Sequence, residues 1–136
     1  MAESTFMLEI VTPEQILFRD EVQFMVAPGA EGELGIMKNH APLVAALDIG
    51  VLRYKNTSGT QKKMALSGGF MEVIDNVARV LAETAEHGED IDILRAKAAK
   101  ERAERRLQAR EDSLNLARAE MALKRAISRL KAAEAL

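Results

Sequence analysis

The chain has 136 residues, a formal net charge of −2 and 48% apolar residues, enough for one ordinary domain or a small domain with an appendage. It has no Cys, which excludes a disulfide framework, Cys-ligated zinc and thiol catalysis. Residues 1–10 hold no basic residue, and no stretch approaches the roughly 20 apolar residues that span a bilayer. We therefore expect neither a signal peptide nor a membrane span.

The first part of the chain has the pattern of short antiparallel strands. In the segment 21–26, Val22, Phe24 and Val26 fall on one face by alternation, which predicts a strand. Polar turns at 56–59 and at 75–76 predict two hairpins, and a Gly68-Gly69 pair predicts a tight turn before another strand. With no helical pattern between them, these segments favour a sandwich or barrel; they are 6–11, 21–26, 50–54, 63–66, 70–74 and 77–81.

The second part has the pattern of two helices. All 8 Gly and all 3 Pro lie at or before Gly88, which marks a boundary in composition. We expect Glu89 or Asp90 to serve the start of the first helix, and the polar segment 111–113 to cap the second. The sequence thus predicts an α+β protein, with an antiparallel β-sandwich over 1–86 and an antiparallel two-helix hairpin over 87–136.

The hairpin is predicted to be weakly held. Its second helix carries an apolar seam in which small alanines alternate with leucines: Leu116, Ala119, Leu123, Ala126, Leu130 and Ala133. Small side chains allow close approach of helices but bury little area each. This is a physical reason to expect an element that opens or detaches; a static hairpin is the alternative.

One face of the predicted first helix carries Asp92, Arg95, Ala99 and Arg102. If the helices are antiparallel, Arg95 and Arg102 approach Arg125 and Arg129 near the end of the second helix. Four guanidinium groups then converge on phosphate oxygens, and the carboxylate accepts from an adenine amino group. The alternative is a solvated face with weak ion pairs, and spacing alone favours that alternative.

Other chemistries find little support in these residues. His40 has no His or Cys partner at metal-ligand spacing, and Ser67 lacks the Gly that a nucleophile elbow requires two residues earlier. No general base, nucleophile and oxyanion donor can be assembled, so we do not expect an enzyme. The net charge of +3 over 89–136, with interspersed acids, argues against a nucleic-acid-binding hairpin.

Four segments taken in order, 31–36, 40–43, 67–73 and 89–96, resemble the epsilon subunits of F-type ATP synthases. The resemblance implies a non-catalytic rotor subunit of the central stalk, with a β-sandwich head that binds the gamma subunit and the c-ring. It implies that Glu33 and His40 lie in the region facing the ring. It also implies a hairpin that extends along gamma and inhibits ATP hydrolysis, with Lys124, Arg125 and Arg129 facing acidic segments of the alpha/beta catalytic subunits.

The resemblance extends to members that bind ATP on the folded hairpin. Ile91, Asp92, Arg95 and Ala96 match their motif, and the supporting positions of those members match Glu86, Arg102, Arg125 and Arg129. This implies ATP as a regulatory ligand, with no metal required by the sequence. It also implies a place at the cytoplasmic face of the cell membrane, reached through the complex.

Lys38-Asn39 stands where many members have Pro-Gly, and we expect the turn to persist because Asn tolerates the left-handed conformation. The alternative function is a free-standing nucleotide-binding sensor, a stable monomer that needs no complex and does not bind gamma.

Overall fold

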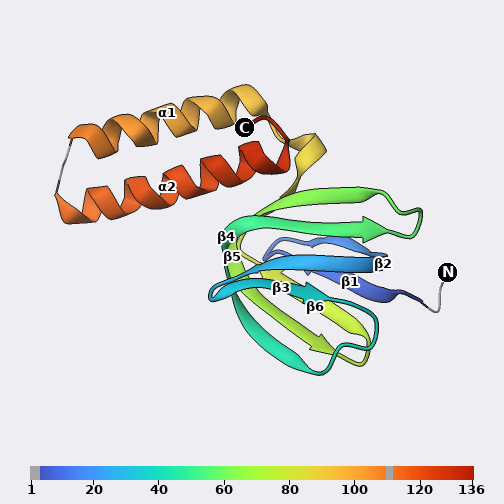
Figure 1. Ribbon diagram of the computed structural model, residues 1–136. Coiled ribbons are helices and arrows are strands. Elements are labelled where there is room, and N and C mark those ends of the chain that lie inside the picture. The colour runs from blue at the N-terminus through green and yellow to red at the C-terminus, as the bar shows by residue number, and fades with distance from the viewer. Residues whose placement is uncertain (1–3, 110–111) are drawn as a thin grey trace.

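The computed structural model describes residues 4–109 and 112–136 and shows a β-sandwich with a two-helix hairpin lying against one end (Figure 1). The predicted α+β architecture is confirmed. The elements in chain order are β1 (Phe6–Val11), β2 (Ile16–Gly29), β3 (Gly32–Ile36), β4 (Leu43–Asn56), β5 (Gln61–Ile74), β6 (Val77–Ala82), β7 (Ala85–His87), the 3₁₀ turn η2 (Gly88–Asp90), α1 (Ile93–Ala109) and α2 (Ser113–Ala132).

The strands form one sheet that closes on itself around a core. Their order is β1-β6-β5-β4-β2-β3, with β7 paired to β5, and β1 also pairs with β2. The pairing of β1 with β6 is parallel, whereas the other pairings are antiparallel. Alternate residues of each strand point inward, as Phe6, Leu8 and Ile10 do, and they meet Met25, Leu52, Met64 and Met71 in the core.

The expected tight turn at Gly68-Gly69 is wrong, because β5 continues through both glycines. Pairing with β4 holds on both sides, with Ile49 opposite Ser67 and Leu47 opposite Gly69. The glycines have φ of 101° and 138°, which lets the strand bend from one layer of the sandwich to the other. A Cβ on Gly69 would collide with the carbonyl oxygen of Leu81, so the position also needs glycine for close packing. The two segments predicted as separate strands are thus one strand.

Both predicted hairpin turns are present. The side chain of Asn56 accepts hydrogen bonds from the backbone N–H groups of Ser58 and Thr60 at 3.1 and 2.9 Å. Asp75 and Asn76 have φ of 51° and 62°, the two positive values of a type I′ turn.

The helices begin at aspartates that cap them. Asp92 accepts a hydrogen bond from the backbone N–H of Arg95 at 3.0 Å, so Asp92 caps α1. The expectation that Glu89 or Asp90 would do so is wrong, because both lie in η2. Asp112 caps α2 by accepting from the N–H of Asn115 at 3.0 Å, as the sequence indicated, while Glu111 lies outside the described residues.

The hairpin is attached to the sandwich through the end of α2. Leu130 and Ala132 are buried there against Ala65 of β5 and Ile91, with Val51, Ala133 and Ala135 packed around them. Most of this contact surface is alanine, so the apolar area that holds the hairpin is small. No helix in the described ranges is long and apolar enough to cross a membrane.

Candidate functional site

A cleft of about 420 Å³ lies where β7, the start of α1 and the last turns of α2 meet. We call it the arginine cleft. Its volume is in the range of small-molecule sites. It brings together seven of the eight residues singled out as a nucleotide site, namely Glu86, Ile91, Asp92, Arg95, Ala96, Arg102 and Arg129; Thr84 and Ala99 complete the lining.

The α1 side of the cleft is the helical face that the sequence indicated. Arg95 and Arg102 are two turns apart on that face, and the small Ala99 between them leaves room for a ligand. Neither guanidinium forms an ion pair with an acid in the described part of the chain. Both groups are therefore available to an anion.

The α2 side of the cleft is organised by an ion pair. Arg129 donates from Nε to Oε1 of Glu86 at 2.9 Å, and both side chains are partly exposed. Arg125 does not line the cleft itself. It lies in an adjoining small hollow that shares Thr84, Glu86 and Arg129 with the cleft. Three of the four predicted arginines thus line the same cleft, and the fourth, Arg125, lines the adjoining hollow.

The charge of the arginine cleft favours an anionic ligand. Arg95, Arg102 and Arg129 oppose only Glu86 and Asp92, and Arg125 adds a further positive charge nearby. Guanidinium groups bind phosphate oxygens in a bidentate manner, which suits a polyphosphate. Among the described residues no group of three or more His, Cys, Asp or Glu is placed to hold a metal ion.

Sequence reasoning missed Thr84. Its hydroxyl lies 2.6 Å from the hydroxyl of Ser67, and its N–H donates to the same Ser67 oxygen at 3.0 Å. Thr84 is two residues before Glu86, so in extended chain both side chains point to the same side. This spacing from Glu86 was the one feature of the sequence that could have pointed to Thr84. It does so only if Glu86 is already assigned to a site.

Family models match nearly the whole chain. The β-sandwich domain of the ATP synthase delta/epsilon chain matches residues 5–88, and the long α-helix domain of the same chain matches residues 89–134. The chain belongs to this family. In this family it is a non-catalytic subunit of the ATP synthase, in the central stalk.

Relatives within the family are similar over most of their length. An ATP synthase epsilon chain from Syntrophomonas wolfei is 75% identical over 134 residues, covering 98% of both chains. One from Desulforamulus reducens is 55% identical, covering 93% of this chain and 96% of the relative. A chain in the OSCP/F1/c-ring structure of the Euglena gracilis mitochondrial ATP synthase superposes with a TM-score of 0.83 at 25% identity, covering 96% of this chain and 82% of that one.

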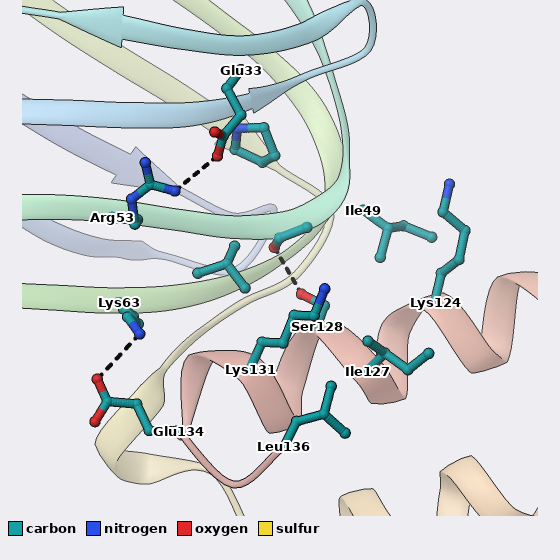
Figure 2. Close-up of a pocket in the computed structure, with 13 residues that line it drawn as sticks. Glu33, Ile49, Arg53, Lys63, Lys124, Ile127, Ser128, Lys131, Glu134 and Leu136 are labelled. Carbon is teal, nitrogen blue, oxygen red and sulfur yellow. Dashed lines mark hydrogen bonds and ion pairs between the residues drawn. The ribbon is translucent and has the colours of Figure 1, made fainter.

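Three residues were expected at partner interfaces alone, and two of them line a second, larger cleft. This sheet cleft of about 820 Å³ lies between the sheet and α2 (Figure 2). Glu33 lies there and accepts from Arg53 at 2.8 Å. Lys124 also lies there and donates to Asp48 at 3.2 Å. The pKa of Asp48 is lowered, first because its carboxylate accepts from the N–H of Ile49 and then because of Lys124.

His40, the third residue, is not brought near the other two. Glu33 lies near the start of β3, and His40 follows beyond the end of that strand. The turn before His40 forms as expected, since Asn39 has φ of 59° and the N–H of His40 donates to the carbonyl of Met37 at 3.2 Å. The imidazole Nδ1 lies 2.7 Å from the carbonyl oxygen of Ala41.

Proposed function

We propose that this chain is the rotor subunit that couples the gamma subunit to the c-ring in a proton-translocating F-type ATP synthase, at the cytoplasmic face of the cell membrane. Membership of the ATP synthase delta/epsilon family carries the proposal. The similar Euglena chain comes from a structure described as containing F1 and the c-ring, which supports the same placement.

The head has an exposed apolar surface suited to the gamma subunit. Phe70 is 58% exposed and Leu81 49% exposed, and these two residues are directly paired between β5 and β6. Val44, 73% exposed, lies on the same outer face of β4. Single exposed apolar residues need no explanation, but a row across neighbouring strands is typical of a protein interface. We assign this row to gamma.

The c-ring contact is proposed at the Met37–His40 turn and along β3. Met37 is 61% exposed next to the turn that holds His40. Because Glu33 and His40 lie at opposite ends of β3, a ring surface that meets both must extend along the strand.

The hairpin is proposed to inhibit ATP hydrolysis when it leaves the head and extends toward the alpha/beta subunits. In the folded state Lys124 is paired with Asp48 and Arg129 with Glu86. Extension would free both cations for acidic segments of the catalytic subunits. Folding therefore keeps occupied the same groups that inhibition would use.

ATP is proposed to bind in the arginine cleft and to favour the folded hairpin. The lining residues come from β7, α1 and α2, so the cleft exists only while these elements are together. A ligand that binds one of two states shifts the population toward that state. ATP should thus act as a regulatory ligand that opposes inhibition.

Calorimetry on the full chain tests the ATP site. We expect saturable binding, weakened about tenfold or more by Arg95→Ala, since hydrogen bonds to charged groups contribute roughly 1.5–3 kcal/mol. Arg125→Ala should weaken it less, because Arg125 lines the adjoining hollow and not the cleft itself. Arg118→Ala is the matched control, because Arg118 is an exposed cation on α2 away from the cleft. Absence of binding at millimolar ATP would remove the nucleotide role and leave the rotor role intact.

Binding to purified gamma subunit tests the rotor role and separates it from the free-standing sensor. The rotor proposal predicts a stable complex that Phe70→Asp weakens at least about tenfold, because a charge would enter an apolar interface. A chain that binds ATP but not gamma would instead favour the sensor.

A further inference from the structure

Ser128 is a buried polar side chain at the junction of the hairpin and the head. It is 4% exposed, and among the described residues only Thr5 is another buried polar one. Its hydroxyl donates a hydrogen bond to the backbone carbonyl of Gly50 at 2.8 Å (Figure 2). The bond joins α2 directly to the backbone of β4, and it forms only while Ser128 faces that strand.

This hydrogen bond lies between the sheet cleft and the small hollow that adjoins the arginine cleft. Ser128 lines the sheet cleft, and it also lines the small hollow that holds Arg125 and Arg129. Successive residues of an α-helix are rotated by about 100°, so turning α2 by one residue would carry Arg129 away from Glu86. The rotation of α2 at Ser128 and the placement of Arg129 in the arginine cleft are therefore linked.

A second close contact holds the end of α2 against η2. The carbonyl of Ala132 lies so near Gly88 that a Cβ at position 88 would collide with it. Just beyond the end of α2, Glu134 forms an ion pair with Lys63 of β5 at 3.2 Å. None of these residues lines the arginine cleft, so the contacts form without a nucleotide.

We infer that Ser128 is a positioning residue for the arginine cleft: its hydrogen bond to Gly50 sets the rotation of α2 and holds the hairpin folded before a nucleotide binds. This inference rests on the proposed ATP site. The apparent affinity for a ligand falls in proportion to the population of the binding-competent state. Loss of the Ser128 contact therefore weakens ATP binding without any change in the residues that line the cleft.

The position of the hairpin can be measured directly, because the chain has no Cys and accepts site-specific labels. We would attach spin labels through Thr57→Cys on the head and Glu120→Cys on α2, both exposed, and measure the distance distribution with and without ATP. The labelled chain that keeps Gly88 and Ser128 should give a narrow distance distribution without nucleotide. Ser128→Ala and Gly88→Ala should each broaden it and raise the apparent Kd for ATP about tenfold.

Two further variants sharpen the test. Ser128→Thr keeps the hydroxyl donor and should restore the narrow distribution, which a role in packing alone would not predict. Arg118→Ala, on the exposed side of α2, should change neither readout.

The outcomes separate the inference from the proposed function. If Ser128→Ala keeps the narrow distribution and the original Kd, the positioning role is wrong while the ATP site stands. If the parent chain binds no ATP, the proposed ATP site is wrong. The positioning of α2 is then supported by broadening in Ser128→Ala and overturned by its absence.

Discussion

The Nε of Arg129 lies 2.9 Å from Oε1 of Glu86, which joins the last turns of α2 to β7 at the arginine cleft. The carboxylate thereby holds in place one of the cations that we propose to bind phosphate. Its own negative charge would be expected to repel a polyphosphate, so the two effects oppose each other.

We predict that orientation outweighs repulsion. Glu86→Ala should weaken ATP binding about five- to tenfold, because Arg129 loses the partner that orients it. Calorimetry against Glu83→Ala measures this, since that control removes the same charge at an exposed position three residues earlier in the chain. Tighter binding in Glu86→Ala would show that repulsion is the larger effect.

The bend in β5 predicts a large cost for a methyl group at Gly69. Gly69→Ala meets both a positive φ and the carbonyl of Leu81, and it should lower the free energy of unfolding by about 3 kcal/mol or more. Gly59→Ala is the control, because its φ is also positive but the space around it is open; about 1 kcal/mol is expected there. Urea unfolding measures both, and equal costs would contradict the steric explanation.

The Asp75-Asn76 turn predicts an ordered series of substitutions at Asn76. The Asn76 side chain accepts from the N–H of Asn39 at 2.7 Å and donates to the carbonyl of Thr5 at 3.1 Å. Asn76→Gly loses both bonds but keeps the left-handed backbone, and should cost about 1–2 kcal/mol. Asn76→Ala should cost about 1 kcal/mol more, because alanine resists a φ of 62°. Thermal unfolding would contradict this account if alanine proved the milder change.

The ion pairs of Glu9 predict acid sensitivity of the head. The pKa of Glu9 is lowered, chiefly by its hydrogen bond from Arg79 at 2.8 Å, with further help from Arg19. The folded state thus binds the Glu9 proton less tightly than the unfolded state does. Its contribution to stability is complete above the ordinary glutamate pKa of 4.5 and is lost as the pH falls through the folded value.

Glu9→Gln should therefore be less stable than the parent near pH 7, with the difference shrinking below about pH 5. Urea midpoints measured from pH 7 down to pH 3 would show the convergence. A difference that stays constant with pH would exclude a role for the charge of Glu9.

Several features of the site could be predicted because they are local in sequence. Asp92, Arg95, Ala99 and Arg102 share a helical face through spacing alone, and the structure places that face on the cleft. The left-handed Asn39 was likewise expected from its residue type. In contrast, the placement of Arg125 beside the cleft rather than in it depends on how α2 is rotated against the sheet.

The sequence by itself determined the division into a stranded head and a helical hairpin, since glycine, proline and the apolar periodicity are properties of neighbouring residues. Only the tertiary structure decided that β5 runs on through Gly68-Gly69, because the backbone bends there to meet Leu81 of another strand. Only the tertiary structure also joined Ser128 to Gly50 and Thr84 to Ser67. These contacts link residues far apart in the chain, and no local pattern specifies which partner a buried hydroxyl will find.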